Sequence, residues 1–286
     1  MGSVTLVGMT YVEPPSVFGF PFEDSAFIDL LEMTFPHPLQ GAIMPVFIQR
    51  HGKPEIAGTA FSIMPNVALT AAHVLVEEGV PRSETAFLLH IGGTYPDGGL
   101  MGGLLPVEQL SLNRAADLAL LRYALPEIDG APLRVKNLPL NFAGPVVGNV
   151  CLAVGYTSGL ELETDDAGGG KISIAPKLHA SKGNVEEVHL AGRDAMLPYP
   201  VFRTSAHLLA QMSGSPIWSG GIGQQRVVGI VTSSYDLADD GGPPISYGSL
   251  LTPALPLSLT FMVDGIEQEV PLREMVDRGL VAGTLP

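Results

Sequence analysis

Short apolar runs dominate the sequence, and Gly or Pro interrupts them every few residues. Most of these runs are about four to eight residues long, which is the length of a β-strand. Alternating helices of the length that a parallel sheet needs are missing, so the pattern predicts a mostly β protein, a barrel or a sandwich. The clearest predicted strands are VFIQR, TAFSIM, VALTAA, AFLLHI, DLALLRY, VCLAVGY, VEEVHL and RVVGIVTS.

The predicted strands fall into two groups, in residues 41–135 and 136–260, which the polar, proline-containing segment RVKNLPLN joins. Residues 1–40 precede them as an N-terminal extension, and residues 261–286 follow as a C-terminal appendage. Residues 157–185 contain the acidic, glycine-rich stretch DDAGGGK. Such a stretch buries little surface, so we expect a mobile loop there.

Both flanking segments contain predicted local elements. In the extension, FEDSAFIDLLEM predicts a short helix with Asp24 or Ser25 as its N-cap. In the appendage, TFMVDGIEQEV predicts a hairpin, because the pair Asp264-Gly265 suits a type I′ turn. PLREMVDRG then predicts a short helix with Gly279 as its C-cap. We expect both segments to pad the surface of the strand groups; regulation is the alternative.

Charge narrows the range of partners. The 15 Lys and Arg residues against 29 Asp and Glu residues give a net charge of −14, and the sequence pI is about 4.8. Because the sequence also lacks a Lys- or Arg-rich block, we expect no nucleic acid and no anionic membrane as partner. No segment reaches the roughly 18 consecutive apolar residues of a membrane span.

Cysteine usage bears on the compartment. Cys151 is the only cysteine, so no intrachain disulfide can form, and a reducing environment is favoured. The first residues lack the basic and apolar regions of a secretory signal. The sequence therefore predicts a cytoplasmic protein.

Three separated segments contain residue types that together support nucleophilic catalysis. They are ALTAAHVL around His73, AADLALLRY around Asp117 and QMSGSP around Ser213. The intervals are 117 − 73 = 44 and 213 − 117 = 96 residues, so His73 and Asp117 fall in the first strand group and Ser213 in the second. A serine becomes a nucleophile only when a base takes its proton and a third group orients that base. Taken alone, QMSGSP is typical of a connecting turn.

The three motifs, in this order and at this spacing, resemble those of the chymotrypsin-fold (trypsin-like) serine proteases of the bacterial intracellular type. The resemblance spans roughly residues 41–260 and implies an all-β fold of two six-stranded antiparallel β-barrels. The first would be residues 41–135, and the second residues 136–260. The matching residues are Thr70-Ala71-Ala72-His73, Asp117 to Leu121, Ser213 to Pro216, Val228 to Val231, and the segment Val147 to Tyr156.

The resemblance also implies roles. His73 would be the general base, Asp117 would orient its imidazole, and Ser213 would be the nucleophile. Thr232 falls where the family has a hydroxyl residue that hydrogen-bonds the buried Asp, although an ordinary strand threonine is an equal alternative. Backbone N–H groups of Gln211 and Ser213 would form the oxyanion hole. The family usually has Gly at the position of Gln211, which raises the hypothesis of an incomplete hole that substrate or a partner completes.

Residues that would form the substrate pocket follow from the same resemblance. His207 stands six residues before Ser213, where digestive trypsins carry an Asp, which disfavours a Lys or Arg preference. Ile245 would face the pocket with Ser234 and narrow it, so we expect a small or medium uncharged side chain. His207 accepting an acidic side chain, or simply packing the pocket floor, are alternatives. Met212 replaces the acidic residue of digestive relatives, so activation by a newly cut amino terminus is not expected.

Two functions remain open. The first is a serine endopeptidase that acts on protein or peptide substrates without a cofactor or metal, since no metal-ligand cluster with usable spacing is present. The second is a protease-derived module that binds an extended peptide by strand addition, or a protease that needs an activating protein partner. The triad favours the first, and Gln211 is the feature that favours the second. Esterase activity of the GxSxG type is disfavoured because Gln211 stands where that motif has Gly.

Overall fold

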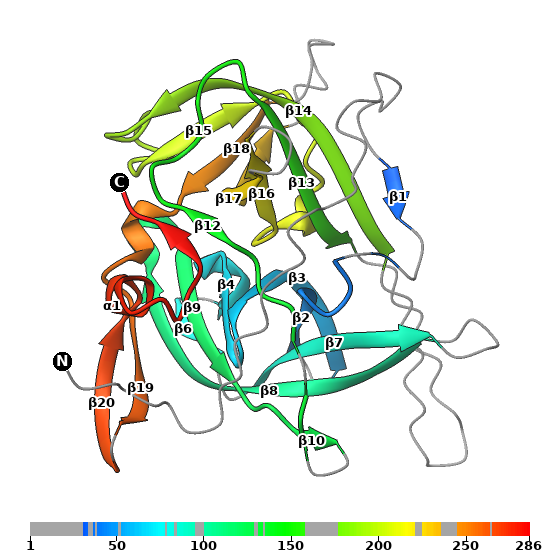
Figure 1. Ribbon diagram of the computed structural model, residues 1–286. Coiled ribbons are helices and arrows are strands. Elements are labelled where there is room, and N and C mark those ends of the chain that lie inside the picture. The colour runs from blue at the N-terminus through cyan, green and yellow to red at the C-terminus, as the bar shows by residue number, and fades with distance from the viewer. Residues whose placement is uncertain are drawn as a thin grey trace.

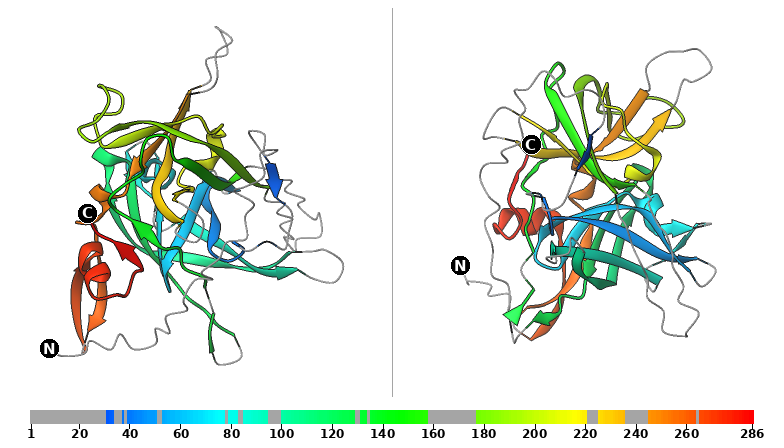
Figure 2. Two further views of the ribbon diagram at one scale, coloured as in Figure 1. Left: turned by 45° about the horizontal axis from the view of Figure 1, so that its top comes forward. Right: turned by 90° about the vertical axis from the view of Figure 1, so that its right-hand side faces the viewer.

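Two β-barrels stack on each other in the computed structural model, as Figure 1 and the right-hand view of Figure 2 show. One is built from strands between residues 43 and 123 and the other from strands between residues 150 and 250. The structure describes residues 31–33, 37, 39–50, 53–77, 79–82, 85–94, 100–128, 131–133, 135–157, 177–220, 225–235, 245–263 and 265–286.

The first barrel is a closed ring of six antiparallel strands in the order β2-β3-β4-β9-β8-β7. Bulges interrupt several of its ladders, as between Val46 and Phe47 on β2, and such bulges bend strands enough to close a barrel. The strands are β2 (Ile43–Arg50), β3 (Lys53–Met64), β4 (Val67–Thr70), β7 (Ala86–Thr94), β8 (Leu100–Asn113) and β9 (Leu118–Tyr123).

The second barrel also has six antiparallel strands, in the order β16-β13-β14-β15-β18-β17, and pairing of β16 with β17 closes the ring. The predicted all-β fold of two six-stranded antiparallel barrels is therefore confirmed. The strands are β13 (Val150–Thr157), β14 (Lys177–His189), β15 (Val201–Thr204), β16 (Pro216–Ser219), β17 (Arg226–Tyr235) and β18 (Ile245–Leu250).

The C-terminal appendage contains the predicted hairpin and helix. β19 (Ser258–Val263) pairs with β20 (Ile266–Pro271), and α1 (Leu272–Asp277) ends one residue before Arg278, with Gly279 next at a φ of 72°. Leu259, Phe261 and Val263 alternate along β19 and are buried in the same apolar cluster as the first barrel. The appendage thus covers a barrel surface, as expected, and the hairpin projects beyond it in Figure 2.

The remaining strands are short. They are β1 (Leu31–Met33), β5 (Val76–Glu77), β6 (Val80–Pro81), β10 (Glu127–Ile128), β11 (Ala131–Pro132), β12 (Leu140–Asn141) and β21 (Gly283–Thr284). Among the described residues, no helix is both long and apolar enough to cross a membrane.

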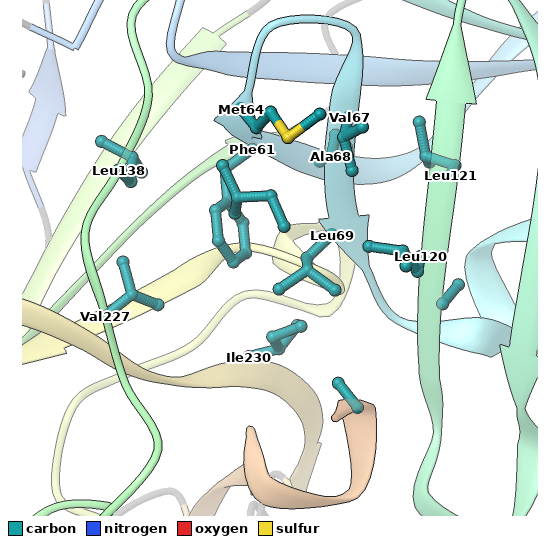
Figure 3. Packing of buried hydrophobic residues seen from close by; sticks show 14 of the residues in the cluster. Phe61, Met64, Val67, Ala68, Leu69, Leu120, Leu121, Leu138, Val227 and Ile230 are labelled. Atoms are coloured by element: carbon teal, nitrogen blue, oxygen red, sulfur yellow. The ribbon is translucent and has the colours of Figure 1, made fainter. Parts of the chain in front are cut away.

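One apolar cluster extends from the first barrel into the second. Phe61 on β3 and Leu69 on β4 belong to the same buried cluster as Val227 and Ile230 on β17, and Figure 3 shows these side chains facing one another. All four are fully buried. Because the hydrophobic effect favours removing this shared surface from water, it holds the barrels together.

Two local predictions differ from the structure. The end of the stretch expected to be helical forms β1, in which Leu31 pairs with Ala180 and Met33 with Leu178 on β14. Backbone pairing with an available strand edge overrides a weak local helix signal there. The expected loop of 157–185 ends earlier, because β14 begins at Lys177; residues 158–176, Asp24 and Ser25 lie outside the described residues.

Candidate active site

His73 lies in a 3₁₀ turn, Ala72–Leu75, that directly follows β4. Small residues precede it, and Ala71 and Ala72 are buried, so the backbone approaches the neighbouring β9 closely. The backbone N–H of Ala72 donates to the carbonyl of Asp117 at 3.2 Å. The His73 side chain is 47% exposed, which leaves the imidazole accessible from solvent while one edge faces Asp117.

Asp117 receives three hydrogen bonds on its carboxylate. The backbone N–H of His73 donates to Oδ1 at 2.9 Å, and His73 Nδ1 lies 2.8 Å from Oδ2. The hydroxyl of Thr232 donates to the same Oδ2. The carboxylate side chain is only 13% exposed, so these donors offset the cost of removing its charge from water.

The backbone of Asp117 is also unusual. Its φ of 52° and ψ of 43° are left-handed, a conformation that Asp tolerates better than most residues. It follows the 3₁₀ turn Arg114–Ala116, where the side chain of Asn113 accepts from the N–H of Ala116 at 3.2 Å. Asn113 Nδ2 also donates to the carbonyl of Pro253 at 3.0 Å. Hydrogen bonds of the Asn113 side chain thus hold the turn that positions the Asp117 carboxylate.

Ser213 follows another 3₁₀ turn, Ala210–Met212, and precedes β16. Its carbonyl oxygen accepts from the backbone N–H of Thr59 on β3 at 2.8 Å, so the loop is bonded to the first barrel. Gly214 has a φ of 82°, and a Cβ there would lie 2.2 Å from both the Thr59 carbonyl and the Thr70 hydroxyl oxygen. Only Gly fits this approach.

Gly58 lies between the Ser213 loop and the His73 turn. A Cβ at Gly58 would be 2.6 Å from the Ser213 carbonyl oxygen and 2.7 Å from Cγ2 of Val74, the residue after His73. The Ser213 carbonyl and the Val74 side chain therefore both occupy the space that a side chain at position 58 would need. The segments that carry Ser213 and His73, 140 residues apart in sequence (213 − 73), thus both approach Gly58.

Thr59 joins both barrels and was not identified from the sequence. Besides its N–H bond to Ser213, its carbonyl accepts from the hydroxyl of Thr70 at 2.6 Å. Its own hydroxyl oxygen accepts from the backbone N–H of Tyr156 on β13 at 2.8 Å. Thr59 is fully buried, and one threonine in a strand carries no sequence signal of such a role.

Gln211 lies inside the 3₁₀ turn, and the N–H of Met212 donates to the carbonyl of Leu209 at 2.9 Å. The only non-glycine residues with positive φ in the described part of the chain are Asn66 and Asp117. The turn Leu209–Met212 is therefore of the type I kind rather than type II, which requires positive φ at its third residue. This choice sets the direction of the N–H of Gln211.

The residues expected to form the substrate pocket lie on separate segments of the second barrel. His207 lies between β15 and the 3₁₀ turn and is half-buried. Ile245 pairs with Tyr235 and packs against the cluster of Leu197, Val201 and Tyr247, whereas Ser234 pairs with Ser246.

Ser246 is a neighbour of the His207 segment that the sequence did not indicate. It is fully buried, and its hydroxyl accepts from the backbone N–H of Leu208 at 3.3 Å. The register of β15 against β18, in which Thr204 pairs with Ser246, brings Ser246 to this segment.

Cys151 takes no part in this arrangement. It is buried on β13, with its sulfur 2.9 Å from the Thr204 hydroxyl, and burial raises the pKa of its thiol to about 11. A thiol of this kind is not a nucleophile near neutral pH.

Comparison with known proteins agrees with this architecture. Residues 58–230, more than half of the chain, match the family described as Trypsin-like peptidase domain. The chain therefore belongs to the trypsin-like peptidase family of chymotrypsin-fold serine proteases, and the resemblance seen in its motifs is confirmed.

No curated protein matches the chain. Among solved structures it is similar to one described as HtrA-type protease AlgW with decapeptide, with 15% sequence identity and a TM-score of 0.47. The similarity covers 76% of this chain and 63% of that chain, so this chain spans less than two thirds of that protease's length.

Proposed function

We propose that the protein is a serine endopeptidase in which His73, Asp117 and Ser213 form a catalytic triad. The observation that carries this proposal is the pair of hydrogen bonds from the backbone N–H and Nδ1 of His73 to the two carboxylate oxygens of Asp117. A carboxylate that binds Nδ1–H leaves Nε2 as the basic nitrogen. The proximity of the Ser213 carbonyl oxygen and the Val74 side chain to Gly58 supports the proposal, because it brings the segment that carries Ser213 near the turn that carries His73.

The proposed reaction begins when Nε2 of His73 removes the proton of the Ser213 hydroxyl as its oxygen attacks a peptide carbonyl. Asp117 remains ionised and stabilises the imidazolium that forms. His73 then gives the proton to the leaving amine, and an acyl-enzyme remains on Ser213. Water, activated by the same base, hydrolyses this ester and restores the hydroxyl. The N–H groups of Gln211 and Ser213 would stabilise the oxyanion of each tetrahedral intermediate.

An extended protein or peptide segment is the proposed substrate. β18 pairs with one edge of β17 through Ser233, Ser234 and Tyr235, whereas β16 pairs with the other edge only as far as Ile230. Within the described chain, the second edge of residues 233–235 has no strand partner. An extended peptide can add to such an edge, next to Thr232 and the triad.

We propose a small or medium uncharged side chain at the cleaved position. No acidic residue occupies the His207 position, so the recognition of Lys or Arg that a buried carboxylate provides is lacking. Cleavage of a mixed peptide library, followed by mass spectrometry of the products, tests this preference. Products ending mainly in Lys or Arg would contradict it.

Labelling with a fluorophosphonate tests the triad. The reagent phosphonylates a serine only when its hydroxyl is activated, so wild-type protein should be labelled and Ser213→Ala should not. Ser215→Ala is a matched control, because its buried hydroxyl lies in the same loop and has no hydrogen-bond partner among the described residues. Equal labelling of wild type and Ser213→Ala would reject the proposed nucleophile.

A second candidate is supported by the turn around Gln211. The type I turn Leu209–Met212 and a type II turn differ by rotation of the peptide between Ala210 and Gln211, which carries the N–H proposed for the oxyanion hole. A positive φ at a non-glycine residue costs about 1–2 kcal/mol. The protein would then be a protease whose hole is completed by substrate or by an activating protein partner, or a peptide-binding module with negligible turnover.

Peptide binding and turnover distinguish these functions. An enzyme that substrate completes is labelled slowly by the fluorophosphonate alone and faster with a peptide product bound at the β17 edge. A binding module retains peptide affinity, with no labelling under either condition. Labelling at full rate without any peptide would argue against this second candidate.

A further inference from the structure

The hydroxyl of Tyr199 continues the hydrogen-bond chain that begins at His73. Tyr199 Oη lies 3.1 Å from the hydroxyl oxygen of Thr232, whose own hydroxyl donates to Oδ2 of Asp117. Oδ2 in turn lies 2.8 Å from Nδ1 of His73. The chain therefore passes from Tyr199 through Thr232 and Asp117 to His73.

Proton accounting fixes the direction of this chain. A threonine hydroxyl has a single proton, and that of Thr232 is used toward the carboxylate of Asp117, which can only accept. The hydrogen bond between Tyr199 and Thr232 must then have the tyrosine as donor. A donor at this place polarises the Thr232 hydroxyl toward Asp117 and fixes its rotamer.

The loop that carries Tyr199 is held by its own hydrogen bonds. The side chain of Asp194 accepts from the N–H groups of Met196 and Leu197, at 2.8 and 3.0 Å. The N–H of Arg193 donates to the carbonyl of Leu197 at 2.8 Å, and the Leu197 side chain is buried. Tyr199 is thus presented from a compact loop between β14 and β15 rather than from a barrel strand.

This hydrogen-bond chain is largely shielded from water, so the direction of its hydrogen bonds affects the triad. Thr232 is 7% exposed, and the Asp117 side chain 13%. A buried carboxylate depends on every donor it has, and its orientation determines where Nε2 of His73 points. The Tyr199 hydroxyl keeps Thr232 directed at Oδ2 of Asp117. It therefore acts on the proposed base, His73, through these two residues.

We propose that Tyr199 is a positioning residue of the triad, which acts only by holding the Thr232 hydroxyl on Asp117. This inference rests on the proposed function, since it presupposes that His73 and Asp117 activate Ser213. It adds a residue from the loop between β14 and β15 to the residues that determine the rate of acylation.

A double-mutant cycle tests the proposal. The readouts are the rate of fluorophosphonate labelling and the hydrolysis of the p-nitrophenyl ester of N-acetylalanine. We expect Tyr199→Phe to lower kcat about 3- to 10-fold, the effect of one lost hydrogen bond, with KM unchanged. In a Thr232→Val background, the same change should have no effect, because the proposal has Tyr199 act on Asp117 through the Thr232 hydroxyl. Additive effects of the two changes would overturn the proposal.

Tyr156→Phe is the matched control. Its hydroxyl is buried without a hydrogen-bond partner in the described part of the chain, so its removal should leave the labelling rate unchanged. The NMR shift of the proton on His73 Nδ1 provides a second readout, which should move in Tyr199→Phe and not in Tyr156→Phe. A shift that is the same in wild type and Tyr199→Phe would also overturn the proposal.

A second variant covers the case in which Tyr199→Phe does not fold. 3-Fluorotyrosine at position 199 retains the ring and the hydroxyl and makes the hydroxyl a stronger donor, so the Nδ1 proton should shift in the direction opposite to that of loss of the hydroxyl. An unchanged shift would overturn the proposal. If wild type is active and depends on His73 and Ser213 but Tyr199→Phe behaves like Tyr156→Phe, only this inference fails. If wild type and Ser213→Ala are alike, the proposed function fails.

Discussion

The backbone N–H of Thr59 donates to the carbonyl oxygen of Ser213 at 2.8 Å, across the interface between the two barrels. The proposed nucleophile is therefore positioned by the barrel that carries its base. The glycine before Thr59 makes this contact close enough, because its missing side chain is what lets the two backbones approach.

Gly58→Ala should disturb this approach. The added Cβ would lie 2.6 Å from the Ser213 carbonyl oxygen, so the loop must move away from the His73 turn. We expect the fluorophosphonate labelling rate to fall at least about 10-fold and the free energy of unfolding to fall by about 1–3 kcal/mol, as for overpacked interiors. Gly103→Ala is the control, because no atom lies within 4 Å of its added Cβ. Equal labelling rates in both variants would contradict the proposed packing.

Asp117→Asn should leave the fold intact and nearly abolish turnover. The amide would present a donor to Nδ1 of His73 and so favour the tautomer that lacks a basic Nε2. By analogy with other triads, kcat is expected to fall by about 10⁴-fold. Steady-state kinetics on the ester substrate, with Asp277→Asn on the surface of α1 as control, measures this loss. A decrease of only a few-fold would argue against Asp117 as the orienting group.

Gln211→Gly should raise activity if the turn limits the oxyanion hole. Glycine adopts positive φ without the penalty that a Cβ brings, so the type II turn becomes more accessible. A gain of about 1 kcal/mol corresponds to roughly a fivefold faster acylation. Burst-phase kinetics with the ester substrate resolves this step. An unchanged acylation rate would show that the Cβ at position 211 does not hinder the hole.

Stability should fall as the pH is lowered from 6.5 to 4, in part because of His37. Burial, with a smaller contribution from the charge of Lys136, lowers the pKa of His37 from 6.5 to about 4. Between pH 6.5 and 4, His37 thus binds a proton in the unfolded chain but not in the folded protein. Protonation therefore favours unfolding as the pH falls.

Denaturant unfolding of wild type and His37→Leu at pH 7, 5.5 and 4.5 measures this contribution. The decrease in the free energy of unfolding with falling pH should be smaller in the variant. Burial lowers the pKa of His90 as well, and its contribution remains in both proteins. Parallel pH curves for the two proteins would mean that His37 is protonated equally in both states.

Much of the fold could be predicted because strands of Val, Ile, Leu and Phe are unambiguous when long. All eight sequence stretches chosen as strands lie wholly or mainly in strands. β8 was missed because Gly102, Gly103 and Pro106 interrupt its apolar pattern; they are tolerated because residues 100–106 of β8 pair with β7 alone. β15 and β16 are only four residues long, too short for a periodic signal.

The residues of the candidate site likewise divide into those that local sequence motifs predict and those that they do not. His73, Asp117 and Ser213 stand in motifs that can be recognised locally, and the Thr232 hydroxyl donates a hydrogen bond to Asp117 in the structure. Thr59, Tyr199 and Ser246 could not be found, because their contacts depend on which strands and loops meet across 33 to 97 residues of sequence. Such contacts depend on which strands pair and in which register, and this pairing cannot be recognised from a single sequence.

The bond between Thr59 and Ser213 also has a consequence for the lifetime of the molecule. This hydrogen bond holds the Ser213 backbone across the interface between the barrels, so a slight separation of the barrels should displace the proposed nucleophile while each barrel is still folded. Loss of activity would then precede unfolding of the barrels when the protein is damaged or heated.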